Sequence, residues 1–202
     1  MSEIAFKSWP KTGRLFRDIV ITEKIDGTNA AIHIREMTDG FNSCPDAYTL
    51  IVNGTRYAVA AQSRKRLITP QQDNHGFARW VYDNAEQLVK ILGTGLHFGE
   101  WWGQGIQRGY GMTSRVFSLF NTAKWKGIGE KVGEHIITSV PVLYEGPFDV
   151  LEINKALKDL KYYGSYASFL YPDPEGICIY HKQANTIFKV TLDGDDAGKW
   201  EL

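Results

Sequence analysis

Short apolar runs dominate this chain, and most of them have the length of β-strands. Residues 18–25 contain the run Ile19-Val20-Ile21, and residues 29–36 alternate between apolar and polar positions. Residues 47–53 and 55–63 form two more candidate strands, joined at Asn53-Gly54, a dipeptide that favours a hairpin turn. We expect the remaining strands near residues 95–101, 115–121, 176–182 and 186–192.

Two segments change to a helical period. Within residues 73–92 the large apolar side chains share one stripe: Phe77, Trp80, Val81, Leu88 and Leu92. We predict a single helix here, with Asp73 as its N-cap and Gly93 as its stop. A second helix is predicted over residues 149–163, with Asp149 at its N-cap. Strands interrupted by two helices indicate an α+β fold with mainly antiparallel sheets.

The size and composition of the chain fit one globular unit. It has 202 residues, of which 43% are hydrophobic and 13% aromatic, enough for one sizeable core. Residues 1–10 lack the apolar segment of a signal peptide, and no apolar run has the length of a membrane span, so we expect a cytoplasmic protein. Cys44 and Cys178 are too few and too distant for a disulfide framework or a zinc site, and we expect Cys178 to be inert core.

The charges balance overall but not locally. The formal net charge is +0, from 23 basic and 23 acidic residues, which argues against a protein that coats nucleic acid through a global field. Acidic residues gather at the C-terminus: Asp193, Asp195, Asp196 and Glu201. Basic residues gather in one stretch: Arg56, Arg64, Lys65, Arg66 and Arg79. This stretch is either a contact for a phosphate backbone or an ordinary solvated face.

Lys24 lies in the segment EKIDGTN (residues 23–29), directly after a predicted strand. A lysine becomes a nucleophile only when desolvation or a nearby cation lowers its pKa. Four further segments follow in order: SRKR (63–66), FGEWWGQGIQ (98–107), VFSLFN (116–121), and the pair PEGICIY (174–180) with IFKVT (187–191).

These five ordered motifs resemble the covalent nucleotidyltransferase superfamily of ATP-dependent ligases and capping enzymes, over residues 20–192. The FGEW…GIQ version is most similar to the RNA ligase 2-like group. The resemblance implies an α+β nucleotidyltransferase (ATP-grasp-like) core, with mainly antiparallel sheets around a nucleotide cleft. Members of this superfamily usually carry a C-terminal domain after the last motif, but only about ten residues follow Thr191 here. We therefore expect a single nucleotidyltransferase domain over residues 1–202, without a C-terminal OB or helical accessory domain, and a partner protein is one candidate source of that domain.

The implied reaction is ATP-dependent sealing of RNA ends. Lys24 attacks the α-phosphate of ATP, pyrophosphate leaves, and AMP stays on the lysine as a phosphoramidate. The AMP then passes to a 5′-phosphate end, and a 3′-hydroxyl finally displaces it. The implied cofactors are ATP and Mg²⁺ (or Mn²⁺), and the implied partner is a nucleic acid with these two ends, RNA rather than DNA.

The resemblance also assigns roles to the residues around Lys24. Glu23 is expected beside the adenine edge, and Asp26 is expected to orient Lys24 or a metal-bound water. Gly27 permits an unusual backbone angle. Asn29 is expected near the reacting ends, and Arg64 is expected to contact the ribose or the 5′-phosphate.

The later motifs supply the remaining candidates. Glu100 is expected to bind the ribose hydroxyls and is a candidate metal ligand, and Glu175 is the main metal candidate. Phe120 is the expected stacking platform for the purine, with Phe117 as the fallback. Lys189 lies between apolar neighbours, so we expect an interior lysine with a phosphate partner.

Two positions depart from the family pattern. Asp26 stands where the RNA ligase 2 group often has histidine, which leaves the type of polynucleotide open. Thr191 replaces the second lysine of the last motif, so one cation is lost. Gln107 and Arg108 receive no role, and three aromatic residues near Glu100 either line the cleft or belong to the core: Trp101, Trp102 and Tyr110.

Two other functions remain open at this point. The first is a DNA ligase or a capping-type nucleotidyltransferase with the same chemistry. The second is a module that binds nucleotide or nucleic acid without turnover. Covalent labelling by ATP, by GTP or by neither would distinguish the three.

Overall fold

The computed structural model describes residues 5–38, 45–169 and 171–193. Four residues discussed above lie outside these ranges: Cys44, Asp195, Asp196 and Glu201.

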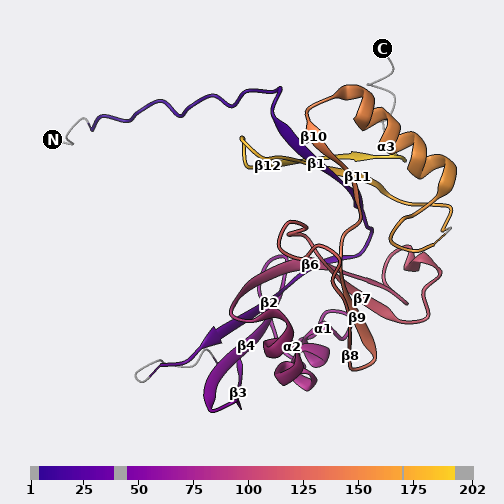
Figure 1. Ribbon diagram of the computed structural model, residues 1–202. Helices are drawn as coiled ribbons and strands as arrows, with labels where there is room; N and C mark the ends of the chain where they lie inside the picture. Colours follow the sequence, from indigo (N-terminus) through magenta and orange to yellow (C-terminus); the bar gives the residue numbers. More distant parts are fainter. Residues whose placement is uncertain (1–4, 39–44, 170, 194–202) are drawn as a thin grey trace.

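Two β-sheets organise the chain (Figure 1). The small sheet has the strand order β10-β1-β11-β12, with bounds Val142–Pro147, Asp18–Lys24, Gly176–His181 and Thr186–Thr191. The large sheet has the order β3-β4-β2-β6-β7-β9-β8, with bounds Tyr48–Val52, Thr55–Ser63, Thr28–Glu36, Gly95–Gly103, Arg115–Leu119, His135–Ser139 and Gly129–Val132. The short strand β5 (Leu67–Ile68) pairs with β4. Within the described residues the strand pairs are antiparallel except for β7 with β9, which confirms a mainly antiparallel α+β fold.

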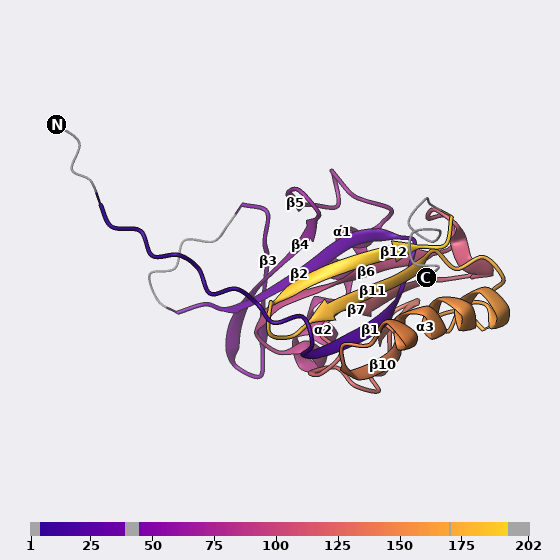
Figure 2. The ribbon, with the colours of Figure 1, turned by 90° about the horizontal axis from the view of Figure 1, so that it is seen from above.

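Among the described residues, each sheet has α-helices on one face only (Figure 1). Figure 1 shows the small sheet and α3 (Val150–Tyr163) on one side of the large sheet, and α1 (Phe77–Asp83) and α2 (Ala85–Leu92) on its other side. In the view from above, β11 and β12 lie over the strands of the large sheet (Figure 2). We use "inner face" for the face of each sheet that is opposite its own helices.

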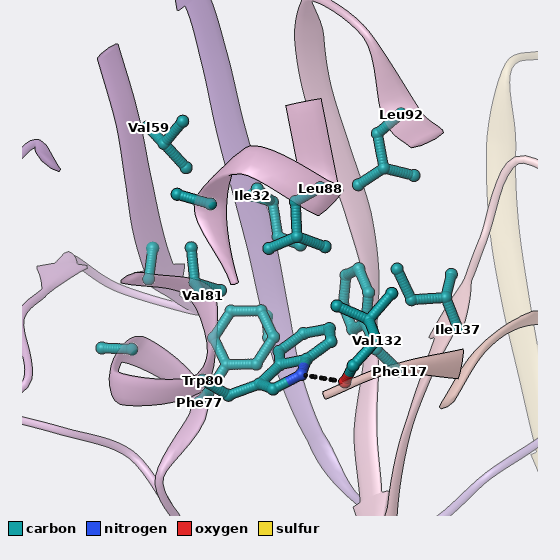
Figure 3. Close-up of a cluster of buried hydrophobic side chains, with 14 of the residues drawn as sticks. Ile32, Val59, Phe77, Trp80, Val81, Leu88, Leu92, Phe117, Val132 and Ile137 are labelled. Carbon is teal, nitrogen blue, oxygen red and sulfur yellow. Dashed lines mark hydrogen bonds between the residues drawn. The ribbon is translucent and has the colours of Figure 1, made fainter. Parts of the chain in front are cut away.

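The main core lies between the large sheet and its two helices. Apolar side chains from β2, β4 and β7 interlock with those of α1 and α2 (Figure 3). Trp80 is 5% exposed, and its indole N–H donates a 2.9 Å hydrogen bond to the carbonyl of Val132. Burial of so many large side chains is the main favourable term in folding, and it fixes the large sheet as a rigid base.

Two smaller apolar clusters hold the rest of the molecule. One lies between α3 and the small sheet and includes Ile19, Ile21 and Leu160. The other lies where the chain passes from β1 into β2, and we name it the junction cluster: Ile25, Trp102, Tyr110, Val116 and Val140. Because Ile25 directly follows β1 and packs here against Trp102 and Val116 of the large sheet, the junction cluster fixes the end of β1 against that sheet.

The predicted helix over residues 73–92 is wrong in one respect, because the structure has two short helices here. The break is at Asn84, whose amide donates a 2.8 Å hydrogen bond to the carbonyl of Trp80 and so competes with the helical backbone bonds. Asp73 does act as a cap, since its carboxylate accepts from the backbone N–H groups of Ala78 and Arg79 at 2.7 and 3.1 Å, although the helix begins at Phe77.

The second predicted helix is confirmed. α3 begins after Asp149, whose carboxylate accepts from the backbone N–H of Leu151, and Gly164 follows its last turn. Four strands were not predicted: β5, β8, β9 and β10. β5 has only two residues, and the other three are short with few buried positions, so they carry little apolar alternation. None of the described helices is long and apolar enough to cross a membrane.

Candidate active site

Lys24 lies at the point where the chain leaves one sheet for the other. It is the last residue of β1 in the small sheet, and β2 begins four residues later in the large sheet. Ile19 and Ile21 of β1 pack towards α3, so alternation places Lys24 on the inner face. Ile25 is buried in the junction cluster and holds the crossover in place. The lysine is therefore presented from a fixed strand end, as the sequence predicts.

Lys24 forms an ion pair with Glu175. Glu175 directly precedes β11, and the strand register sets Lys24 opposite Gly176. The side chains of Lys24 and Glu175 are 22% and 18% exposed, so the pair is only partly screened by water. Two residues that are far apart in the sequence are thereby brought together as predicted.

Glu100 completes a cluster of charges around Lys24. In the large sheet it lies opposite Asn29, on the inner face of β6. Burial raises the pKa of Glu100 to about 7, the positive charge of Lys24 opposes this, and the charges of Glu175 and Asp26 raise the pKa further. Four predicted site residues thus interact electrostatically at one place: Lys24, Asp26, Glu100 and Glu175.

The raised pKa of Glu100 gives a testable pH dependence in metal-free protein. The folded state holds this proton more tightly than the unfolded chain, so it binds more protons between pH 4.5 and about 7. The free energy of unfolding should therefore fall as pH rises through this window, by no more than about 3 kcal/mol. The measurement is urea unfolding at several pH values, in which Glu100→Gln should lack this fall in the free energy of unfolding. Glu130→Gln, at an exposed position, should keep it. The same pH profile in Glu100→Gln as in the wild type would contradict the raised pKa of Glu100.

Two glycines allow the close packing around Lys24. A Cβ at Gly27 would lie 2.6 Å from the carbonyl oxygen of Trp101 and 2.7 Å from the Cβ of Trp102. Gly176 has φ +151°, and a Cβ there would lie 2.1 Å from the carbonyl oxygen of Val190. Any side chain at either position would displace the backbone that carries Lys24 or Glu175.

Arg108 organises the surroundings of Asp26, which the sequence did not indicate. Its guanidinium contacts the carboxylate of Asp26 at 3.2 Å and that of Asp173 at 2.7 Å, and it also pairs with Asp193. These three carboxylates come from the turn after Lys24, the loop before Glu175 and the end of β12. The pairs raise the pKa of Arg108, chiefly through the hydrogen bond with Asp193. Arg108 therefore joins the segments that carry the charge cluster.

The predicted effect of losing Arg108 is a slower reaction in a folded protein. Arg108→Gln would leave three carboxylates together without a cation, so Asp26 and the loop before Glu175 should shift. The rate of the self-adenylylation that the sequence resemblance implies should fall roughly 10- to 100-fold, with a smaller change in the KM for ATP. Arg108→Lys should restore part of the rate, because lysine keeps the charge but not the fork of donors. Equal rates in the wild type and Arg108→Gln would contradict this positioning role.

Lys189 differs from its predicted environment. It lies on β12, at the edge of the small sheet, and its side chain is exposed rather than interior. The register aligns it with Cys178 and Thr22 on the inner face, so it still lies on the same face as Lys24. Thr191 is aligned with Lys24 across Gly176. The edge position explains the difference, since an edge strand leaves its side chains open to water.

The two candidates for stacking on the purine, Phe117 and Phe120, differ in exposure. Phe117 is fully buried in the main core, so its side chain is not available to stack on a base. Phe120 follows β7 and is 38% exposed, and its backbone N–H donates to the carbonyl of Phe98. Phe98 is 42% exposed on the inner face of β6. Phe120 therefore stays the predicted stacking residue, with Phe98 beside it.

Glu23 has a structural role that was not predicted. It is 1% exposed, and its carboxylate accepts hydrogen bonds from Ser165 Oγ at 2.6 Å and from the backbone N–H groups of Tyr166 and Ala167 at 2.8 and 2.9 Å. Burial raises the pKa of Glu23, and these hydrogen bonds oppose the rise. Glu23 therefore ties the loop after α3 to the strand that carries Lys24, and its place beside the adenine stays a prediction.

The basic stretch does not form one patch. Arg64, Lys65 and Arg66 are exposed in the turn after β4. The last residue of β4, Ser63, lies opposite Ala30 of β2, so this turn lies close to the level of Asn29. Arg56 lies near the other end of β4, about 26 Å away along the strand. Grouping Arg56 with the three others is therefore wrong, whereas Arg64 remains near the predicted site.

The three aromatic residues near Glu100 belong to the core, whereas Cys178 does not. Trp101, Trp102 and Tyr110 are at most 2% exposed and belong to the apolar clusters, so the core alternative is confirmed for them. The hydroxyl of Tyr110 accepts a 2.9 Å hydrogen bond from the backbone N–H of Asp26. Cys178 is only partly buried, on the inner face, so its placement as core is wrong. Burial raises the pKa of the Cys178 thiol.

The carboxylates suit a divalent cation only in combination with other ligands. Among the described residues, no group of three or more His, Cys, Asp or Glu side chains is arranged to hold a metal ion. Glu175 Oε2 is buried with no hydrogen bond, and its charge partner is Lys24. Mg²⁺ is commonly held by one or two carboxylates together with substrate phosphates. Glu100 and Glu175 fit that pattern if a nucleotide supplies the remaining oxygens.

The sequence matches the RNA ligase family model over residues 17–191. A comparison with curated proteins gave no match. Solved structures of Naegleria gruberi RNA ligase share the fold. A lysine-to-methionine mutant with AMP and Mn aligns with a TM-score of 0.52 and 14% identity, over 88% of this chain and 50% of that one.

Two other mutants of the same ligase, both with ATP and Mn, give similar values. An arginine-to-alanine and a glutamate-to-alanine mutant each align with a TM-score of 0.51 and 14% identity, over 89% of this chain and 51% of the other. This chain therefore spans about half the length of the solved ligase chains that it matches, and the likeness at this identity concerns the fold.

Proposed function

This chain belongs to the RNA ligase family, and from that premise we propose that it is an ATP-dependent RNA ligase of the nucleotidyltransferase type. In this proposal Lys24 is the nucleophile that carries AMP between ATP and a 5′-phosphate end.

The observation that carries the proposal is the charge cluster around Lys24. A lysine at a fixed strand end is paired with Glu175, and Glu100 and Asp26 lie close enough to influence the same charges. A lysine held only for stability would not require two further acids at the crossover between two sheets. A partly buried acid with a raised pKa, gathered with other charged groups as Glu100 is here, is typical of a functional site.

The proposed reaction has three steps. Lys24 Nζ, as the free amine, forms a bond to the α-phosphorus of ATP while the bond to the pyrophosphate oxygen breaks. An oxygen of the RNA 5′-phosphate then attacks the same phosphorus and the bond to nitrogen breaks. Finally, the 3′-hydroxyl attacks the 5′-phosphate, and AMP leaves. Each step depends mainly on positioning and on neutralising phosphate charge.

A divalent cation fits the first step. When bound, it would neutralise phosphate charge, and Glu175 would then have a charge partner other than Lys24. Glu100 and Glu175 would hold it together with the nucleotide phosphates. The Naegleria complexes with ATP and Mn, and with AMP and Mn, support a nucleotide and a divalent cation on this fold.

The remaining predicted residues take roles around the nucleotide in the same proposal. Phe120 would stack on the purine from the inner face of the large sheet. Arg64 and Asn29 would contact the ribose or the reacting ends, and Lys189 would contact phosphate from the edge of the small sheet. Glu23 would lie near the adenine while it holds the loop after α3.

The proposal is tested by incubating the protein with α-labelled ATP or GTP and Mg²⁺ or Mn²⁺, followed by denaturing electrophoresis. Label from ATP alone, and its transfer to a nicked RNA duplex in preference to a nicked DNA duplex, is expected. Label from GTP would indicate a capping-type enzyme, and preference for DNA would indicate a DNA ligase. No label with either nucleotide, in folded protein, would contradict the proposed activity.

A further inference from the structure

The N-terminal segment before β1 is the most exposed part of the described chain. We name residues 5–12 the N-terminal arm. Phe6 and Trp9 of the arm are 93% and 88% exposed, which is unusual for two large aromatic side chains. Within the described residues, the arm makes no hydrogen bond or ion pair. Figure 1 shows it extending away from both sheets.

The arm is fixed to the body at its C-terminal end. The backbone N–H of Arg14 donates a 3.1 Å hydrogen bond to Gln183 in the turn between β11 and β12. The carbonyl of Leu15 is 2.9 Å from Nε2 of His181, and the ring of Phe16 meets that of Phe148 edge-on at 6.0 Å. The arm therefore projects from a defined place at the end of the small sheet.

Charge and aromatic character alternate along this segment. Residues 5–17 contain four cations and no acidic residue: Lys7, Lys11, Arg14 and Arg17. Phe6 and Trp9 alternate with the first two of them. Pro10 favours an extended backbone at Trp9 and limits the entropy lost on binding. Exposed aromatic rings between cations suit nucleic acid, because bases stack on the rings and the cations contact phosphates.

The charges around Lys24 leave little positive charge there to hold a polynucleotide, so we expect RNA to need a second contact on the protein. Lys24 is already paired with Glu175, and Arg108 is engaged by three carboxylates. The net charge of the chain is +0, so no general field holds a polyanion. A polynucleotide bound only at this site would therefore be held weakly.

We propose that the N-terminal arm is a second RNA contact, which binds the substrate strand at a distance from the sealed junction through Phe6, Trp9, Lys7 and Lys11. This inference rests on the proposed function. β1 runs six residue steps from Asp18 to Lys24, so the start of β1 lies about 20 Å from the nucleophile. The arm precedes that point and extends away from it (Figure 1), so it contacts RNA roughly six or more base pairs from the junction.

The test measures RNA binding without ATP, so it stays informative even if adenylylation fails. Fluorescent, 5′-phosphorylated nicked RNA duplexes are compared, one with about 15 base pairs on each side of the nick and one with about four, closed by hairpin loops. Phe6→Ala with Trp9→Ala should weaken binding to the long duplex about 10-fold or more. Lys7→Gln with Lys11→Gln should reduce the salt slope by about two.

Three controls define the outcome. The short duplex should bind all variants equally, and self-adenylylation should not change. Lys161→Gln with Tyr162→Ala, an exposed pair on α3, should bind like the wild type. Wild-type affinity of the arm variants for the long duplex would overturn the proposal. The proposal would also be overturned if sedimentation showed that the arm variants lose a dimer and that this loss accounts for their weaker RNA binding. Binding of the wild-type protein to anionic vesicles through the arm, without binding to RNA, would overturn it as well.

Discussion

Lys24→Arg is expected to abolish self-adenylylation as completely as Lys24→Ala, by at least about 10³-fold. Arginine keeps the positive charge and can keep the ion pair with Glu175, so the fold should be unaffected. Its guanidinium stays protonated at any physiological pH and cannot attack phosphorus. The measurement is the rate of covalent labelling by α-labelled ATP.

The matched control for Lys24→Arg is Lys158→Arg, an exposed position on α3. It makes the same chemical change away from the site and should label like the wild type. Substantial labelling of Lys24→Arg would place the nucleophile on another residue.

Glu175→Gln is expected to slow adenylylation by roughly 10²-fold or more at limiting Mg²⁺. The amide has nearly the same shape as the carboxylate, so packing before β11 should be kept. It removes the charge that faces Lys24 and the charge proposed to hold a cation. The measurement is a titration of the labelling rate with Mg²⁺ or Mn²⁺, in which the loss should shrink as metal concentration rises.

The small sheet offers a matched control for this change. Glu145 pairs with Lys182 at 2.7 Å on the same sheet, and both side chains are at least 40% exposed. Glu145→Gln breaks an ion pair of the same type but away from Lys24, and an exposed pair contributes little to stability. It should keep the wild-type rate. Near-normal labelling of Glu175→Gln at limiting metal would contradict its proposed role.

Local sequence patterns predicted most of the elements that carry the site. The strand that ends at Lys24, the turn through Gly27 and the acid before β11 were all predicted from neighbouring residues. The ordered motifs also brought Lys24, Glu100 and Glu175 into one group, which the structure places together. Strand ends are well marked in a sequence, because glycine and proline interrupt an apolar alternation there.

The errors concern information that alternation does not contain. Lys189 and Cys178 both have apolar neighbours, but the pattern does not tell an edge strand from a central one, or the inner face from the helix-covered face. Arg108 was missed because its three partners lie 82, 65 and 85 residues away in the sequence. Only the tertiary fold brings those carboxylates together.

The central claim is that AMP is carried by Lys24, and peptide mapping tests it most directly. The protein is incubated with ATP and Mg²⁺, denatured, digested and analysed by mass spectrometry under conditions that preserve phosphoramidates. The account predicts one AMP-bearing peptide, with the modification on Lys24. AMP on any other residue, or an unmodified Lys24 peptide in protein that seals RNA, would contradict it.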